Sequence, residues 1–371
     1  MKTNWISLPL DSVASIDYGT RVVQKKDGGS IYPVYGGGGE TFRMDKFNRQ
    51  DILVISRFAM SAQCTRFVRG PFFLNDSGLT VSTKSNSLSQ AFLEKYLIAH
   101  NDDIYLMGKG MAQRNLDMPS FRKFIVSFPE SVKEQQRIVD ELDLLTGIID
   151  KKNAQLRDLD ALAQSIFYEM FGNIIANEKK WPFGRFADIC APRSSIKRAS
   201  KSYLPSDSIE YIEISSIDNK RQKLTGTTAF IFSDAPSRAQ QVVQYEDVLI
   251  SMVRPNLKNI AVVDLDHNRL VASSGFCVLR ANNRSNSSFI KSFIGTDAFT
   301  QYLMDRVTGA NYPAVKEDDI KGCRIGVPPV DLQRQFAERV VVIERQKQLI
   351  SSALDEFGSL LSGRMDLYFN E

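Results

Sequence analysis

Apolar residues recur at steps of three and four along residues 134–171, a stretch without proline. Nine of the ten positions on this seam are apolar: Ile138, Leu142, Leu145, Ile149, Lys152, Leu156, Leu159, Ala163, Ile166 and Met170. A sustained 3.5-residue spacing predicts a long helix that buries a narrow seam against another helix. At 1.5 Å per residue, such a helix is about 57 Å long, which is out of proportion to one small domain.

The same seam recurs at the C-terminal end of the chain. Adding 198 to each position gives Phe336, Val340, Ile343, Lys347, Ile350, Leu354, Phe357, Leu361, Arg364 and Tyr368. We therefore expect two long helices that pack against each other. Each seam contains a lysine, Lys152 in the first and Lys347 in the second. A polar seam residue can fix the register of the helices, but a lysine can equally extend past the seam into solvent.

The remaining apolar runs form two similar sets. The first set predicts strands at 31–35, 51–56, 78–82 and 121–128, a helix at 92–99 and a polar loop at 109–116. Faint echoes follow in the same order at 247–251, 274–278, 289–294 and 308–315. A series of ordered matches indicates an internal duplication of the unit domain–helix.

The duplication divides the chain into four parts. We expect mixed α/β domains at 1–128 and 176–327, and long helices at 129–175 and 328–371. The predicted fold class is α+β, with a pseudo-two-fold internal repeat. If the two-fold axis lies perpendicular to the helices, they pack as an antiparallel coiled coil.

The net charge of +4 hides an alternation along the chain. The four parts carry net charges of +5, −4, +5 and −2 in order. Basic segments of this kind can mark a nucleic-acid surface, although an excess of five charges also lies within ordinary scatter. The acidic helices are poorly suited to phosphate and are free for protein contacts.

The sequence offers little catalytic chemistry. It has no P-loop, no G-x-G-x-x-G after a strand and no Asn-Pro-Pro-aromatic stretch, and the run at 36–39 (GGGG) favours a hairpin end over a ligand loop. Four scattered cysteines and two histidines predict no metal site. The thiols indicate a reducing compartment, and no apolar run is long enough for a membrane span. We expect a cytoplasmic chain without membrane contact, without its own cofactor and without a catalytic site. A catalytic pair of carboxylates is the one kind of site that these sequence patterns do not reveal.

Polar loops beside the predicted strands are the candidates for DNA contact. Arg, Asn and Gln suit base edges, and Lys and Arg suit phosphates. A basic cluster at 193–201 adds to them. Each residue alone is more often a solvated surface residue, but similar placement in both halves favours binding. The candidates are Arg57, Arg66, Lys109, Gln113, Arg114 and Asn115 in the first domain, and Arg193, Lys197, Arg198, Arg254, Asn256, Lys258, Asn311 and Tyr312 in the second.

Several motifs resemble those of one known family. Each long helix follows a proline with a Gln-containing segment, PESVKEQQRI from Pro129 and PPVDLQRQF from Pro328. The run from Tyr32 reads YPVYGGGG, and Gly-led loops begin at Gly110 (GMAQRNL) and Gly309 (GANYPAV). With the alternation of domains and helices, the whole chain resembles the specificity (S) subunits of type I restriction–modification systems.

The resemblance implies a function. Such subunits have no catalytic site, and each recognition domain reads one half of a bipartite target in double-stranded DNA. Their helices set the spacer and dock two modification subunits, which bind S-adenosylmethionine, and restriction subunits join them, with ATP expected in partner subunits. Two other classes stay open at this point: a stand-alone DNA methyltransferase or nuclease with its own active site, and a coiled-coil scaffold that binds only proteins.

Overall fold

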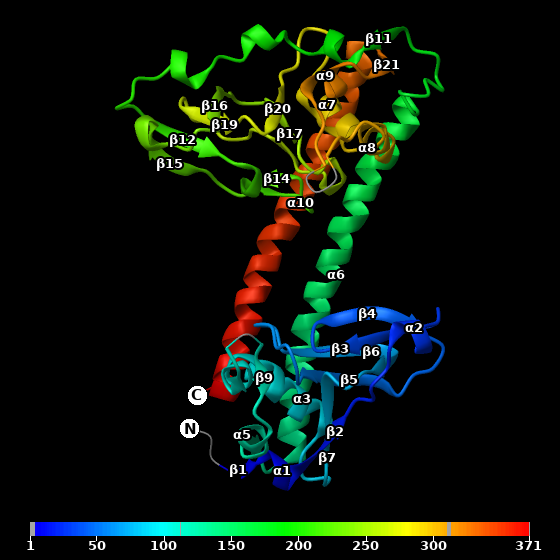
Figure 1. Cartoon of the computed structure of the whole chain (residues 1–371), viewed down its shortest axis with the longest axis vertical. Coiled ribbons are helices and arrows are strands. Elements are labelled where there is room, and N and C mark those ends of the chain that lie inside the picture. Colours follow the sequence, from blue (N-terminus) through cyan, green and yellow to red (C-terminus); the bar gives the residue numbers. More distant parts are fainter. Residues whose placement is uncertain (1–3, 112, 310–312, 371) are drawn as a thin grey trace. The chain divides into compact units, whose positions relative to one another are not determined.

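The computed structural model describes residues 4–111, 113–309 and 313–370 (Figure 1). The chain folds into two compact units. Unit 1 comprises Met1–Asn153 and Ser352–Glu371, and unit 2 comprises Ala154–Ser351. No helix in the described part of the chain is both long enough and apolar enough to cross a membrane.

Unit 1 is built around a six-stranded sheet. Its strand order is β2 (Ala14–Tyr18), β7 (Gly78–Thr83), β5 (Arg49–Ser56), β6 (Thr65–Leu74), β3 (Tyr32–Gly36) and β4 (Gly39–Met44). Only β3 and β6 pair in parallel. The strands and the helix predicted before residue 100 are confirmed, and the four glycines close the β3–β4 hairpin. The other elements are β1 (Trp5–Pro9), paired with β10 (Ile125–Pro129), the hairpin β8 (Gly108–Lys109)–β9 (Asn115–Leu116), α1 (Leu10–Val13), α2 (Gln24–Asp27), α3 (Gln90–Ala99), α4 (Asn101–Leu106) and α5 (Met118–Arg122).

The strand predicted at 121–128 is wrong in its first half. Helix α5 occupies Met118–Arg122, and β10 begins only at Ile125. Asp117 caps the helix, because its carboxylate accepts a hydrogen bond from the Ser120 backbone N–H at 3.2 Å. Pro119 lies in the first turn, where backbone N–H groups have no partner within the helix. Proline suits this place because it has no N–H. The cap and the proline outweigh the apolar alternation that predicted a strand.

Unit 2 contains two main sheets. One has the order β18 (Ile260–Val262), β17 (Val248–Ser251) and β20 (Phe276–Leu279). The other has the order β15 (Thr228–Ile231), β12 (Ser208–Ile212), β19 (Leu270–Ser273) and β16 (Ala239–Val242). The smaller elements are β11 (Phe183–Arg185), paired with β21 (Arg324–Gly326), β13 (Ile217–Asp218), paired with β14 (Lys223–Leu224), α7 (Ser287–Ile294), α8 (Asp297–Met304), α9 (Glu317–Lys321), and the 3₁₀ turns η1 (Phe186–Ile189), η2 (Arg193–Ser195), η3 (Ala199–Lys201), η4 (Ile214–Ser216), η5 (Phe232–Asp234) and η6 (Pro255–Leu257).

The two units repeat one plan. The pair β1–β10, the pair β5–β7 and the helices α3, α4 and α5 correspond in order to β11–β21, β17–β20 and α7, α8 and α9. The order of elements therefore agrees with the internal repeat that the sequence predicts. The main difference follows the first short helix of each unit. Unit 1 there forms strand β2, whereas unit 2 forms the 3₁₀ turns η2 and η3.

Helices α6 (Val132–Phe171) and α10 (Val330–Met365) each contribute to both units. In unit 1 the first turns of α6 share a core with the last turns of α10, through Ile138, Leu142, Leu361 and Met365. In unit 2 the last turns of α6 lie beside the first turns of α10. The two helices therefore pack antiparallel, as predicted. Every seam position that the sequence predicts is buried or half-buried.

The most buried residues at the end of α6 lie beside the predicted seam, not on it. Phe167 and Phe171 are almost completely buried, although the sequence pattern selected Ile166 and Met170. Their rings contact Phe336 of α10 at centroid distances of 5.6 and 5.3 Å. They also contact Phe289 of α7 at 5.7 and 5.0 Å. The core of unit 2 covers a second side of α6, and a two-helix pattern cannot anticipate this.

The seam lysine of α10 forms two ion pairs. The Lys347 Nζ lies 2.7 Å from Asp160 Oδ1 and 3.1 Å from Glu344 Oε1. Burial alone would lower the pKa of Lys347, but the two carboxylates outweigh it and raise that pKa. Lys347 is therefore an ion-paired part of the seam and does not extend past it into solvent.

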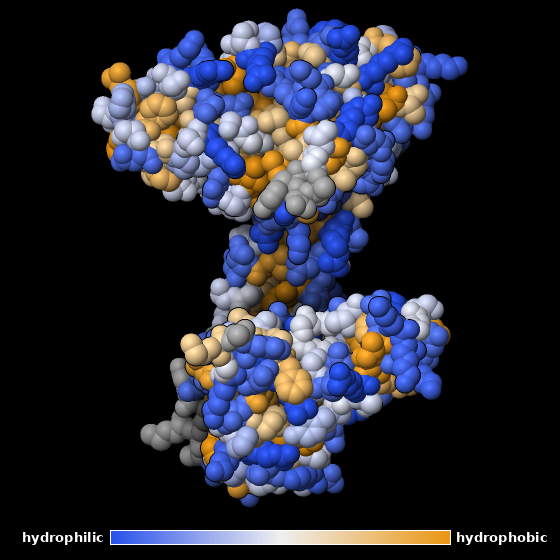
Figure 2. Space-filling view, in the orientation of Figure 1, coloured by the Kyte–Doolittle hydropathy of each residue, from blue (hydrophilic) through white to orange (hydrophobic). Residues whose placement is uncertain are grey.

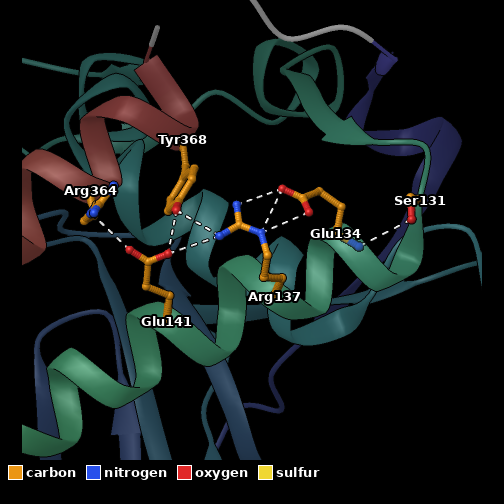
Figure 3. Close-up of polar contacts among 6 residues, drawn as sticks. All are labelled: Ser131, Glu134, Arg137, Glu141, Arg364 and Tyr368. Atoms are coloured by element: carbon orange, nitrogen blue, oxygen red, sulfur yellow. Dashed lines mark hydrogen bonds and ion pairs between the residues drawn. The ribbon is translucent and has the colours of Figure 1, made fainter.

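A second polar cluster joins the helices in unit 1 (Figure 3). Glu141 of α6 forms an ion pair with Arg364 of α10 at 3.0 Å and accepts a hydrogen bond of 2.6 Å from the Tyr368 hydroxyl. Arg137 contacts the same tyrosine and binds both carboxylate oxygens of Glu134. Polar side chains from two distant segments thus pair with one another around Arg364, which is the second charged residue of the C-terminal seam.

A completely buried glutamine lies in the first turn of each long helix, and the two are 198 residues apart. The Gln135 amide donates to the carbonyls of Pro129 and Ser87 and accepts from the Ser89 N–H, each at 2.8 Å. The Gln333 amide donates to the carbonyls of Pro328 and Arg284 and accepts from the Ser285 hydroxyl. The Gln-containing segment after each proline therefore supplies an amide that satisfies buried polar groups.

We expect Gln135→Ala to lower the free energy of unfolding by about 1–3 kcal/mol, because it leaves buried backbone groups without partners. The neighbouring exposed Gln136→Ala is the matched control and should stay within about 0.5 kcal/mol of the original chain. Urea unfolding followed by circular dichroism measures both. Equal stability of the two variants would contradict the structural role of the buried amide.

Candidate nucleic-acid interface

Three loops of unit 1 meet where β5 ends. The Arg57 N–H donates to the Ser77 carbonyl at 2.8 Å, which joins the loop after β5 to the turn before β7. The Leu116 N–H donates to the Arg57 carbonyl at 2.9 Å, and the Met60 N–H donates to the Arg114 carbonyl at 2.9 Å. These bonds bring the loop after β5 together with the Gly-led segment before α5.

The glycine hairpin belongs to the same place. The Ser56 hydroxyl donates to the Gly37 carbonyl at 2.6 Å, and the Gly37 N–H donates to the Ser77 hydroxyl at 3.1 Å. A side chain on Gly37 would lie 2.6 Å from the Phe58 carbonyl oxygen, so this close approach of the backbones requires glycine. The motif from Tyr32 therefore ends beside the candidate DNA-binding loops.

Two arginines of unit 1 stack on aromatic rings. The Arg57 guanidinium lies 4.7 Å from the centre of the Tyr18 ring and 4.4 Å from that of Phe58. The Arg114 guanidinium lies 4.6 Å from the centre of the Tyr105 ring and donates to the Tyr105 carbonyl at 3.3 Å. Stacking of this kind orients a guanidinium and limits its rotamers. Both arginines are half-buried.

The other candidates of unit 1 differ in their freedom. Gln113 is exposed, whereas the Asn115 side chain accepts a hydrogen bond of 3.2 Å from the Ala59 N–H. Lys109 forms an ion pair of 3.1 Å with Asp117, and hydrogen bonds from Ser120 and Lys109 lower the pKa of that carboxyl. Arg66 lies on β6, and its guanidinium lies beside Gly39 of the hairpin. A Cβ atom added to Gly39 would lie 2.9 Å from one guanidinium nitrogen. The structure thus gathers the six candidates of unit 1 around one loop cluster.

Unit 2 repeats the backbone pattern with other side chains. The Met252 N–H donates to the Gly275 carbonyl at 2.9 Å, and the Val315 N–H donates to the Met252 carbonyl at 2.9 Å. The Arg254 N–H donates to the Pro313 carbonyl at 2.7 Å. By these bonds the counterpart of Arg57 is Met252, and Arg254 follows two residues later.

The loop after β17 combines exposed and tethered candidates. Arg254 and Asn256 are exposed. The Lys258 ammonium donates to Asp297 Oδ1 at 2.6 Å and to the Gly295 carbonyl at 3.0 Å, so it holds the loop against α8. Both Arg254 and Lys258 have φ of 50°, a left-handed backbone conformation on each side of η6. Two candidates from the sequence, Asn311 and Tyr312, lie outside the described residues.

The basic cluster of unit 2 has its own anchors, η2 and η3. Lys197 and Arg198 are exposed, and their backbone is held by β16 through the bond from the Val242 N–H to the Lys197 carbonyl. Arg193 forms an ion pair of 3.1 Å with Glu317 of α9. This segment is therefore fixed by elements other than the loop after β17.

Sequence reasoning missed two kinds of residue in the candidate interface. Tyr18 and Phe58 stack on Arg57, and only Phe58 is adjacent to it in the sequence. Ser77 joins two loops through its backbone and its hydroxyl. No local pattern could have revealed Tyr18 or Ser77, because both act through contacts across the sheet.

Known proteins resemble the chain in sequence and in fold. Residues 3–158 match the family model of the type I restriction modification DNA specificity domain. The putative type I restriction enzyme MjaX specificity subunit of Methanocaldococcus jannaschii is 19% identical over 318 residues, which cover 78% of this chain and 71% of that protein.

Two solved structures share the fold over nearly the whole chain. The type I restriction–modification S subunit from M. genitalium aligns with a TM-score of 0.62 and 16% identity, over 99% of this chain and 96% of that one. A chain from a structure on complex assembly and conformational transition of the type I restriction–modification system aligns with a TM-score of 0.51 and 14% identity, over 99% and 98% of the two chains.

Two units of one plan, two antiparallel long helices and a matching specificity domain define a DNA specificity protein. Residues 3–158 match the type I restriction modification DNA specificity domain, and the whole chain has the fold of solved type I specificity subunits. These similarities support a DNA specificity subunit of a type I restriction–modification system, itself non-catalytic. The resemblance, the fold class and the role of DNA specificity subunit predicted from the sequence are confirmed.

We expect Gly110→Ala to distort the loop that carries the candidates 113–115. Gly110 has φ of +119°, and an added side-chain carbon would lie 2.2 Å from the Gln113 carbonyl oxygen. The strain should cost about 1–3 kcal/mol of unfolding free energy and weaken DNA binding by the assembled enzyme. Gly38→Ala is the control, since nothing lies within 4 Å of that position. Denaturation and fluorescence anisotropy should therefore separate the two variants; identical behaviour would sink the idea.

Proposed function

We propose that the chain reads a bipartite target in double-stranded DNA, with the domain at 1–128 on one half-site and the domain at 176–327 on the other. The repeated cluster of three loops carries this proposal. The same backbone bonds hold different side chains in the two units, Arg57 in one and Met252 in the other. Exposed polar side chains lie on loops of each cluster, Gln113 in unit 1 and Asn256 in unit 2. Two readers with one framework and different side chains suit two different half-sites.

The long helices supply the spacer in this proposal. The segments 129–175 and 328–371 would fix the length of the DNA gap between the two half-sites. The reason is that both helices are continuous, α6 over 40 residues and α10 over 36 residues. Paired charges at Lys347 and at Arg364 oppose slippage of one helix along the other. A gap of constant length follows from a seam of fixed register.

The helices would also dock two modification subunits, with restriction subunits joining the assembly. Exposed apolar side chains recur 198 residues apart, at Leu144 and Val342 and again at Leu162 and Leu360. Figure 2 shows hydrophobic residues at the surface among the hydrophilic residues of the long helices. Single exposed leucines are ordinary, but a repeated set suits two copies of one partner.

Four free buried cysteines fit the cytoplasm as the place of assembly.

The gapped target is tested by methylation mapping. Co-expressed with its cognate modification subunit, the chain should direct adenine methylation to one gapped sequence. Gln113→Ala should relax one half of it and Asn256→Ala the other, each by about 1–3 kcal/mol of discrimination. Each variant is the control for the other, and the isolated chain should neither methylate nor cleave DNA. An ungapped motif, or relaxation of both halves by one variant, speaks against the proposal.

The docking proposal is tested by stoichiometry. Leu144→Asp and Val342→Asp are each expected to remove one modification subunit, because a buried carboxylate opposes an apolar contact. Leu349→Asp is the matched control: Leu349 is exposed on α10, but its counterpart 198 residues earlier is the charged Lys151. Mass photometry of the purified complexes counts the subunits. Loss of both subunits from Leu349→Asp, or of none from the other two, would overturn the assignment.

A further inference from the structure

One segment of unit 2 contains several basic residues and no acidic residue. Between residues 189 and 206 the chain has four basic residues and no acidic one: Arg193, Lys197, Arg198 and Lys201. We call residues 193–201 the basic segment. It follows η1, at the place in the repeat where unit 1 has strand β2. Strand β2 carries one charge, Asp17, so the basic segment is a feature of the second repeat alone.

A buried ion pair fixes the start of the basic segment. The Arg280 guanidinium binds both carboxylate oxygens of Asp247, at 2.8 and 2.7 Å, and Asp247 is 1% exposed. The remaining Arg280 nitrogen donates to the Ser195 carbonyl at 2.9 Å. The Ala191 N–H donates to the Arg280 carbonyl at 2.7 Å. Arg280 thus replaces, with side-chain bonds, the ladder that β2 forms with β7 in unit 1.

The far end of the basic segment is also anchored. The Val242 N–H of β16 donates to the Lys197 carbonyl, and Ala199 is completely buried. The Tyr203 N–H donates to the Ala199 carbonyl at 2.9 Å. The backbone is therefore held at both ends while the long cationic side chains between them face solvent.

The exposed cations are free of carboxylates. Within the described ranges no carboxylate lies within ion-pair distance of Lys197, Arg198 or Lys201, whereas Arg193 is paired with Glu317. An open groove of about 710 Å³ runs along the segment, and none of the residues that line it is acidic. Its polar lining comes from Lys197, Arg198, Lys201, Ser194, Ser202 and Tyr203.

A second basic hollow of unit 2 shows the contrast. It lies beside α7 and has a volume of about 210 Å³. Its Lys291 and Lys347 face Glu344 at 3.7 and 3.1 Å, and Lys347 also faces Asp160. Those cations are neutralised within the protein. Lys197, Arg198 and Lys201 have no such partners among the described residues, so an external anion can supply the opposite charge.

We propose that the basic segment binds the phosphodiester backbone of DNA without reading sequence, while the loop after β17 reads bases. Lysine, arginine and serine are phosphate-binding side chains, and the segment contains no asparagine or glutamine for adenine edges. Arg280 is its positioning residue. The inference rests on the proposed reading of a half-site by unit 2 and adds a division of labour within that unit.

The test is the salt dependence of DNA binding by the chain assembled with its modification subunits. The triple variant Lys197→Gln, Arg198→Gln, Lys201→Gln should flatten the slope of log affinity against log salt by about 2.7, at about 0.9 per lost phosphate contact. Between 50 and 200 mM salt, the original complex should then lose roughly 40-fold more affinity than the variant does. The methylated motif should stay the same in both halves.

A charge-matched control separates local contact from net charge. Lys180→Gln, Lys220→Gln, Arg284→Gln removes three exposed cations of unit 2 outside the segment and should leave the slope within about one contact of the original. An unchanged slope in the segment variant would overturn the inference, and so would a changed second half-site, which would mean that the segment reads bases. If the original complex binds no gapped target, the proposed function itself fails, so the two failures are distinguishable.

Arg280→Lys tests the positioning role. It keeps the charge but loses the two-pronged bond to Asp247 and the bond to Ser195. The slope should fall partway toward that of the triple variant, with the first half-site still read. If Arg280→Lys fails to fold, the triple variant, which changes only exposed side chains, still decides the inference. An intact slope in folded Arg280→Lys would remove Arg280 from the scheme.

Discussion

The buried amides of Gln135 and Gln333 are the contacts on which the rest of the structure depends. Strand β10 ends in Pro129, and Pro328 follows shortly after strand β21. A long helix begins just after each proline, which leaves backbone carbonyls facing the core. One amide satisfies the end of the strand and, in the same step, the loop before α3 or α7. The direction in which each long helix leaves its sheet is therefore fixed by hydrogen bonds that water cannot replace. The register of the seam, the pairing of the helices and the position of the loops all depend on the direction in which each helix leaves its sheet.

The duplicated core conserves volume and lets charge diverge. Helices α3 and α7 match with Phe92, Leu93, Tyr96 and Leu97 against Phe289, Ile290, Phe293 and Ile294, all buried. At the matching position between them, unit 1 has Glu94 and unit 2 has Lys291. Burial raises the pKa of Glu94, which is bonded to Gln90, and burial lowers the pKa of Lys291, which faces Glu344. Opposite charges fit one site because each has a local partner.

The sequence predicts what local periodicity determines. The seams of α6 and α10 are confirmed because a 3.5-residue pattern records which side of a helix is buried. Helix α5 was missed because one capping carboxylate, Asp117, outweighs an apolar alternation. The loop cluster was only partly predictable. Its residue types were visible, but the bonds from Arg57 to Ser77 and from Leu116 to Arg57 join segments far apart in the sequence.

The same long-range bonds explain how one fold can present two different sets of loop side chains. In both units the backbone of the loop after the central strand is satisfied by the backbone of two other segments, so its side chains carry little of the fold's stability. Arg57 and Met252 occupy one backbone position with unlike side chains. Replacement of β2 by a basic segment goes further, because it exchanges a whole strand while Arg280 preserves the attachment. Backbone-to-backbone closure thus leaves the side chains of the loop cluster free to change while the core and the helices stay as they are.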